Sequence, residues 1–329
     1  MTAGLTVQDL TVRYGQVTAV DDISFSVAPG TVLGLVGESG SGKSTAARAV
    51  VGLAPAQGSI MLDNVDLGRL PGRQARRERR RLQMIFQDSR SALDPRFTVA
   101  QCVAEGLPSA SGVDHGRPDP ARDAPRRSRG RIAELLELVS LDTGLMNARP
   151  RALSGGQRQR VAIARALAAE PDVLVADEVT ASLDVSVQAV VLNLLRRLQA
   201  DLGLTMIFIS HNLSVVRYMA DQIAVMYDGR IVEQGPTADL IAGPEHPCTR
   251  SLLAAIPQMG QRRLLSDEGI EASVVSGPAS APGCAYRLRC PIGPAASSDG
   301  REICTSTDPM AEAFDRHHQT ACHFASVGS

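Results

Sequence analysis

The chain has 329 residues, six cysteines, no tryptophan and a formal net charge of −1 at pH 7. This length suits about two domains and a core that holds together without disulfides. A near-neutral chain is a poor candidate for binding nucleic acid or anionic membranes through bulk charge. The first residues lack a signal-peptide pattern and no apolar run approaches the ~18 residues that span a bilayer, so we expect a soluble, cytoplasmic protein.

Strands and a glycine-rich loop dominate the first part of the chain. Apolar and polar residues alternate over 5–14, which predicts a half-buried strand. The nearly continuous apolar run 31–36 predicts a strand buried on both faces, and a helix is expected over 43–53. Basic residues fill 73–81, which we interpret as a solvated helix face because the rest of the chain is not basic. A short strand is expected over 82–86.

The middle of the chain alternates helices and strands. Residues 106–130 are rich in Pro, Gly, Ser and Arg and lack apolar periodicity, which predicts a mobile surface insertion. Helical periodicity returns from residue 131. The elements expected after it are a strand at 173–178, a helix at 187–203, a strand at 205–210 and a hairpin at 223–235. This alternation predicts a parallel sheet covered by helices. A change to Pro/Gly/Ser-rich sequence with cysteines places a boundary near 236–250.

The stretch "GESGSGKST" fits the pattern G-x-x-x-x-G-K-[ST] and lies between a buried strand and a helix. Glycines there let backbone N–H groups face one point, and the helix N-terminus adds its positive end, so the loop predicts a phosphate cradle. Lys43 would contact the β- and γ-phosphates, and the Ser44 hydroxyl would ligate Mg²⁺. The predicted nucleotide-binding residues of this loop are Gly37, Glu38, Ser39, Gly40, Ser41, Gly42, Lys43, Ser44 and Thr45.

Acidic and polar residues that follow other strands complete this predicted site. Asp177 ends the strand "VLVAD", where a parallel sheet presents its ligands, and would hold magnesium. Glu178 follows and could accept a proton from the attacking water. Gln87 could ligate magnesium or orient water, and His211 could donate to the γ-phosphate. Tyr14 could stack on adenine.

The stretch "LSGGQRQRVAIARAL" resembles the signature motif of ATP-binding-cassette (ABC) ATPases, and six motifs occur in the order of that family. The resemblance implies an α/β, ABC-type P-loop NTPase with a RecA-like parallel sheet core, an antiparallel β subdomain and a helical subdomain at about 88–165. It also implies an anion site formed by Ser154, Gly155, Gly156 and Gln157. One departure is Val179, where the family usually has Pro; no catalytic group is lost.

The chain carries one phosphate loop and one signature, so one copy cannot complete an ATP site. The resemblance implies that ATP is buried head to tail between two ATPase subunits, either two copies or this chain and a paralogue. We expect an ABC nucleotide-binding domain at 1–240 and a C-terminal extension of the oligopeptide-transporter type at 241–329.

Three functions compete: the ATPase subunit of an importer, half of an exporter, and a soluble non-transport ABC ATPase. Exporter halves usually carry membrane helices on the same chain, and soluble cassettes usually carry two cassettes or a long coiled coil. The stretches "GLVGESGSGKST", "MIFQDSRSALDPRFTV" and "GPEHPCTRSLLAAIP" resemble the dipeptide/oligopeptide/nickel importers. That resemblance implies peptide uptake, with nickel or another small solute as the alternative.

The importer resemblance also implies partners and a location. Two transmembrane permease subunits, a second ABC ATPase subunit and an extracytoplasmic solute-binding protein would complete the complex, and no nucleic acid is expected. The chain would lie peripherally on the cytoplasmic face of the cell membrane. The stretch after Gln87 would contact the permease.

Four cysteines gather near the C-terminus in the spacing C-x₅-C-x₁₃-C-x₁₇-C. Four thiolates suit either a [4Fe–4S] cluster or Zn²⁺, although the paired C-x₂-C of zinc ribbons is missing. The resemblance favours iron–sulfur, with a metal that folds a tail too poor in apolar residues to form its own core. The proposed ligands are Cys284, Cys290, Cys304 and Cys322, with His317, His318 and His323 as weaker candidates. Cys102 and Cys248 have no assigned role.

Overall fold

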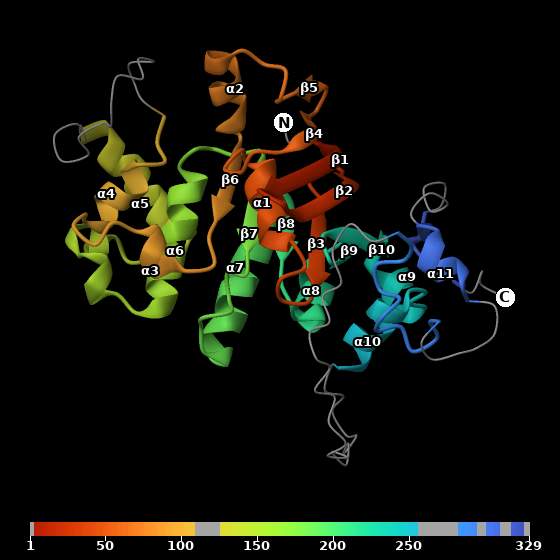
Figure 1. Cartoon of the computed structure of the whole chain (residues 1–329). Coiled ribbons are helices and arrows are strands. Elements are labelled where there is room, and N and C mark those ends of the chain that lie inside the picture. Colours follow the sequence, from red (N-terminus) through yellow and green to blue (C-terminus); the bar gives the residue numbers. More distant parts are fainter. Residues whose placement is uncertain (1–2, 109–125, 256–281, 295–300, 310–316, 326–329) are drawn as a thin grey trace.

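The computed structural model describes residues 3–108, 126–255, 282–294, 301–309 and 317–325 (Figure 1). Most of the insertion expected over 106–130 lies outside the described residues, as does the segment 256–281 of the tail. No helix in these described ranges is long and apolar enough to cross a membrane.

A seven-stranded sheet forms the centre of the molecule, in the order β11-β10-β9-β3-β8-β7-β6. Its strands are β3 (Val32–Gly37), β6 (Leu82–Ile85), β7 (Val173–Asp177), β8 (Thr205–Ile209), β9 (Gln222–Tyr227), β10 (Arg230–Pro236) and β11 (Gln319–Thr320). The five strands from β9 to β6 are parallel, as the alternation of strands and helices predicted. The hairpin of β9 and β10 turns at Asp228 and Gly229, both at positive φ, and the predicted hairpin is thus confirmed.

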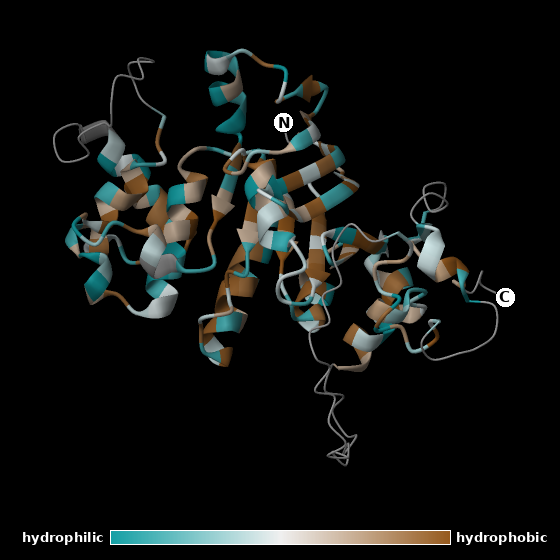
Figure 2. Ribbon diagram, in the orientation of Figure 1, coloured by the Kyte–Doolittle hydropathy of each residue, from teal (hydrophilic) through white to brown (hydrophobic). Residues whose placement is uncertain are grey.

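Both faces of this sheet are apolar, and each face contributes to a different core. Leu33 and Leu35 of β3 pack into one core, whereas Val32 and Val36 pack into the other. Successive side chains of a strand point to opposite faces, so an unbroken apolar run is what such a strand requires. In Figure 2 the central strands are accordingly mostly brown.

The first core lies between the central sheet and a smaller antiparallel sheet of order β2-β1-β4-β5. Its strands are β1 (Leu5–Tyr14), β2 (Val17–Val27), β4 (Gln57–Leu62) and β5 (Val65–Asp66). Helix α1 (Lys43–Val50) is buried between the sheets and ends three residues earlier than expected. The reason is Gly52, which adopts a left-handed conformation (φ +77°) that continues no helix.

The second core lies under the helices on the opposite face and extends into a helical group beside the sheet. The helices are α3 (Ser89–Ala92), α4 (Val99–Ala104), α5 (Arg126–Leu138), α6 (Gly155–Leu167), α7 (Val185–Leu202), α8 (Leu213–Met219), α9 (Thr237–Ala242) and α10 (Pro247–Ala254). Helix α2 (Gly72–Arg79) buries no residue and is mostly teal in Figure 2, which confirms the prediction of a solvated basic helix.

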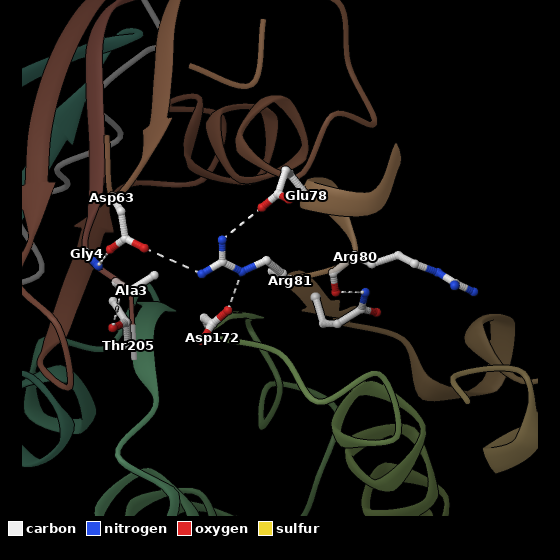
Figure 3. Close-up of polar contacts among 9 residues, drawn as sticks. Ala3, Gly4, Asp63, Glu78, Arg80, Arg81, Asp172 and Thr205 are labelled. Atoms are coloured by element: carbon white, nitrogen blue, oxygen red, sulfur yellow. Dashed lines mark hydrogen bonds and ion pairs between the residues drawn. The ribbon is translucent and has the colours of Figure 1, made fainter. Parts of the chain in front are cut away.

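Arg81 joins the antiparallel sheet, α2 and the central sheet at one point (Figure 3). Its guanidinium donates to Asp172 just before β7 at 2.5 Å, to Glu78 of α2 at 2.8 Å and to Asp63 after β4 at 3.5 Å. A planar guanidinium with five donors can serve several carboxylates at once, which an ammonium group cannot do in the same geometry.

The described residues after 281 pack against β10 and α10. Glu233 of β10 is buried, and its carboxylate accepts the N–H groups of Glu245 and His246 at 2.8 and 3.0 Å. The same carboxylate pairs with His318 beside β11 at 2.8 Å. Tyr286 is buried against Tyr227 of β9, with ring centroids 4.9 Å apart. The short helix α11 (Ile303–Ser306) completes this part.

Candidate nucleotide-binding site

The phosphate loop connects the end of β3 to the start of α1, where the sequence predicted a cradle. Gly42 precedes the helix with φ +98°, and a Cβ there would lie 2.5 Å from the carbonyl oxygen of Ala19. Only glycine fits at that position, because both the conformation and the space exclude a side chain. Glycine at this position lets the loop turn tightly into the N-terminus of α1, the end of a helix that attracts anions.

Lys43 is buried, and its side chain folds back onto the loop. Its Nζ donates to the carbonyl oxygens of Gly37 and Glu38, at 2.9 and 2.6 Å, and to the Ser41 hydroxyl at 3.1 Å. Burial lowers the pKa of Lys43, although the nearby carboxylates of Glu178, Asp177 and Glu38 oppose that shift. The three donors of the ammonium group are thus all bonded to oxygens of the loop itself, which holds the charge beside the proposed phosphate site.

Ser44 and Asp177 face each other beside this lysine. The Ser44 hydroxyl donates to Asp177 Oδ1 at 2.9 Å, and Asp177 is 2% exposed at the end of β7. Burial raises the pKa of Asp177, whereas the Ser44 hydrogen bond lowers it. A hydroxyl and a buried carboxylate oxygen at this separation are the hard oxygen ligands that Mg²⁺ takes, so the residues present fit that ion.

Glu178 contacts both of the polar residues that were predicted to follow other strands, Gln87 and His211. Gln87, after β6, donates from Nε2 to Glu178 Oε2 at 2.7 Å, and His211 Nδ1, after β8, lies 3.3 Å from Oε1. Glu178 itself has φ +43°, a strained backbone for a residue with a side chain, and its N–H donates to the carbonyl oxygen of Ile209. The structure therefore brings together groups from β6, β7 and β8 at the carboxyl edge of the sheet.

The signature residues lie at the N-terminus of α6, within the helical group. The Ser154 hydroxyl accepts from the Gln157 N–H, and the Gln157 side chain accepts from the Ser154 N–H, which is a capping box. A Cβ on Gly156 would lie 2.6 Å from Val187 of α7, so this glycine packs directly against that helix. Tyr14, at the end of β1, is 49% exposed, so its ring is accessible for the predicted stacking on adenine.

The four tail cysteines belong to one part of the extension, and all are free thiols. Burial raises the pKa of Cys284 to about 11, and the thiols of Cys304, Cys322 and Cys290 add to that shift. The Cys284 N–H also donates to the carbonyl oxygen of Cys304 at 2.9 Å. Within the described residues, however, no three or more His, Cys, Asp or Glu side chains are arranged so that they could hold a metal ion.

One residue beside the site has no counterpart in the sequence predictions. Arg289 reaches from the extension to the phosphate loop and pairs with both carboxylate oxygens of Glu38, at 2.6 and 2.9 Å. These residues are 251 positions apart, and no sequence motif contains both of them. No pattern in the sequence could have revealed this contact.

Two family models match the chain. The model described as "ABC transporter" matches residues 20–181. The model described as "Oligopeptide/dipeptide transporter, C-terminal region" matches residues 232–296. The matched residues include the phosphate loop, the signature and two of the four tail cysteines, Cys284 and Cys290.

Similar proteins of known sequence or structure agree with these models. A Brucella ovis protein named for peptide import and ATP binding is 44% identical over 312 residues, which are 94% of this chain and 93% of that protein. The oligopeptide transport ATP-binding protein OppF of Bacillus subtilis is 47% identical over 247 residues, 74% of this chain and 77% of OppF.

Among solved structures, the ATP-binding cassette MJ0796, a dimer bound to ADP and Pi, is 27% identical with a TM-score of 0.61. The match covers 71% of this chain and 98% of that one. The cbiO1 protein of Clostridium perfringens, part of an ABC transporter complex, is 29% identical with a TM-score of 0.61, over 74% of this chain and 92% of cbiO1. The chain therefore belongs to the ATP-binding proteins of ABC transporters, a family of ATPases that use ATP and Mg²⁺.

Proposed function

We propose that this chain is the ATP-hydrolysing subunit of a membrane importer and that it drives uptake of peptides through separate permease subunits. The observation that carries the proposal is the similarity over 94% of the chain to a protein named for peptide import, extension included. The C-terminal match to an oligopeptide/dipeptide transporter region supports the same substrate class. The relatives named above carry no reference to nickel, so the nickel alternative is not favoured.

The geometry of the site supports a division of roles among its residues. Lys43 would bind the phosphates, Ser44 and Asp177 would hold Mg²⁺, and Glu178 would accept the proton of the attacking water. Gln87 and His211, both beside Glu178, would orient that water and contact the γ-phosphate. The ion supplies charge to neutralise the phosphate oxygens when it is bound.

The second half of each ATP site would come from another subunit. The signature residues are fixed by their own capping box at the start of α6, where the positive end of the helix would attract an anion. We propose a head-to-tail pair, either of two copies or of this chain and a paralogue, on the cytoplasmic face of the membrane. Two permease subunits and an extracytoplasmic solute-binding protein would complete the importer.

Purification of the tagged chain from native membranes, followed by identification of the co-purifying chains, tests this function. We expect two permease subunits and a second ATPase subunit, and we expect peptide with its binding protein to stimulate hydrolysis in proteoliposomes. Stimulation by nickel alone would assign the other substrate class. Purification with no membrane protein at all would favour a soluble ATPase.

We also propose that Cys284, Cys290, Cys304 and Cys322 hold a [4Fe–4S] cluster that stabilises the extension. The support is chemical: four soft thiol donors lie in the described residues after 281, and the Cys284 N–H donates to the Cys304 carbonyl oxygen at 2.9 Å. Two of the alternative histidine ligands are engaged elsewhere, since His318 pairs with Glu233 and His323 lies 3.0 Å from the Thr307 carbonyl oxygen. The boundary of this proposed unit is residue 241.

Metal analysis of anaerobically purified protein tests the cluster. We expect brown protein with about four irons per chain, as four-thiolate ligation implies, and loss of the colour in the variant Cys290→Ser. Cys102→Ser is a matched control, because Cys102 is buried in the helical group. Stoichiometric zinc in colourless protein would identify the other metal, and metal-free protein with an intact extension would contradict a metal centre.

A further inference from the structure

The C-terminal extension contacts the phosphate loop through one ion pair. Arg289 NH1 and NH2 lie 2.6 and 2.9 Å from the two carboxylate oxygens of Glu38, a bidentate geometry. The side chains are 33% and 41% exposed, so solvent screens the pair only in part. Through this contact a positive charge of the extension lies beside Glu38, the second residue of the phosphate loop.

Glu38 is held on two sides. Arg289 binds its carboxylate, and Lys43 Nζ donates to its carbonyl oxygen at 2.6 Å. The Glu38 charge also acts on Lys43, since it is one of the three carboxylates that favour the charged lysine. A carboxylate this close to the cradle opposes the binding of phosphate anions, and a guanidinium paired with it removes that opposition.

The position of Arg289 depends on how the extension is packed. Tyr286, three residues earlier, contacts the rings of Tyr227 and His246, with centroids 4.9 and 5.5 Å away. The Arg289 guanidinium lies 5.8 Å from the Tyr227 ring centroid, and Cys290 follows it directly in the chain. A change in the fold of the cysteine-containing segment would therefore move Arg289 away from the phosphate loop.

We infer that Arg289 is a positioning residue for the phosphate loop and that, through it, the C-terminal extension sets the affinity of the subunit for ATP. The inference rests on the ATP site proposed above. It assigns the extension an effect on nucleotide binding in addition to its own folding. Arg289 contributes no group to hydrolysis itself, so its effect falls on binding more than on turnover.

A double-mutant cycle on the full chain tests this coupling. ATP binding is measured by fluorescence with a labelled nucleotide, and KM and kcat are measured separately. We expect Arg289→Ala to raise the Kd for ATP about five-fold, as the loss of a partly exposed bidentate pair implies, with a smaller change in kcat. Arg289→Ala combined with Glu38→Gln should bring the Kd back toward the parental value, because the unpaired carboxylate is gone.

Arg287→Ala is the matched control. Arg287 lies in the same segment and donates to the Cys284 carbonyl oxygen at 3.0 Å, so Arg287→Ala removes a neighbouring positive charge and leaves the Arg289–Glu38 pair in place. An Arg289→Ala Kd equal to the parental one overturns the inference, as does an equal effect of Arg287→Ala. Independent effects of the two changes in the cycle also overturn it. Lys43→Ala separates failure of this inference from failure of the proposed ATP site. If Lys43→Ala binds ATP normally, the proposed function itself is wrong.

Discussion

At the scale of single residues, Lys43 carries the largest predicted effect on nucleotide binding. Lys43→Ala removes the ammonium group that the loop holds beside the proposed phosphate site. Because hydrogen bonds to charged groups contribute about 1.5–3 kcal/mol, we expect ATP affinity to fall roughly ten- to a hundred-fold. Equilibrium binding of a labelled nucleotide measures it, with a thermal unfolding scan to show that the variant is folded. Turnover at the parental rate would contradict the assignment of the phosphate loop.

Glu178 is predicted to affect hydrolysis and to leave binding intact. Glu178→Gln keeps the shape of the side chain beside Gln87 and His211 but removes the proton acceptor. General-base catalysis contributes about 10²- to 10⁴-fold, so hydrolysis should fall by that factor while an ATP-bound dimer accumulates. Phosphate release and size-exclusion chromatography measure the two effects.

Glu170→Gln is the control for that change, because the Glu170 side chain is 69% exposed and pairs only with Arg131 among the ion pairs described. The control should hydrolyse ATP normally. If Glu178→Gln does so as well, the general base is another group.

The residues of the site were predictable where a motif fixes them in space. A phosphate loop between a strand and a helix, and polar residues after parallel strands, must meet at one edge of the sheet, so Lys43, Asp177 and Glu178 could be predicted. Arg289 could not, because its contact with Glu38 depends on how a distant segment packs. The metal site stays a prediction, because the thiols gather without a ligating arrangement.

At the scale of elements, α10 depends on a histidine that must stay neutral. His246 Nδ1 accepts the Cys248 N–H at the start of the helix, and burial lowers the pKa of His246 to about 4, with a smaller contribution from Arg250. In the unfolded chain His246 binds a proton near pH 6.5, whereas in the folded protein it does so only near pH 4. The contribution of neutral His246 to the free energy of unfolding is therefore complete above pH 6.5 and is lost as the pH falls toward 4. The loss should reach about 3 kcal/mol.

His246→Asn tests this pH dependence. Asparagine can cap the helix but does not titrate, so urea midpoints at pH 7.5 and 5 should differ less than in the parent, even though packing against Tyr286 is weakened. His317→Asn is the control, since the His317 side chain is 81% exposed, and it should keep the parental pH dependence. An unchanged slope in His246→Asn would assign the acid sensitivity to other groups.

The elements that sequence predicted best are those whose pattern reflects burial. Strand β3 was predictable from its apolar run, because both of its faces are covered. The predicted end of α1 was three residues too late, because the turn at Gly52 ends the helix and depends on local backbone conformation. Strand β11 was not predictable: its two polar residues form a strand only because β10 offers an edge.

At the scale of the whole molecule, Arg81 holds three parts of the nucleotide-binding fold together (Figure 3). Arg81→Ala leaves three carboxylates near one another without their shared cation, so we expect the free energy of unfolding to fall by about 1–3 kcal/mol. Arg81→Lys should recover only part of it, because a point charge cannot serve the same fork of contacts. Urea unfolding measures both variants.

Arg80→Ala provides the matched comparison, since the Arg80 side chain is exposed and extends away from this cluster in Figure 3. It should unfold within about 0.5 kcal/mol of the parent, as surface substitutions usually do. Equal losses in Arg80→Ala and Arg81→Ala would show that net charge, rather than the junction, is responsible.

The order of strands in the central sheet also matters while the ribosome makes this protein. Strand β3 carries the phosphate loop, but its two neighbours, β8 and β9, belong to the last part of the sheet to be translated. The Val32 N–H, for example, donates to the carboxylate of Asp221, which is translated 189 positions later. Until then the nascent chain exposes an apolar strand with both edges unpaired, the state most prone to aggregate. The strand that carries the phosphate loop thus gains both of its edge partners only after more than 200 residues have been synthesised.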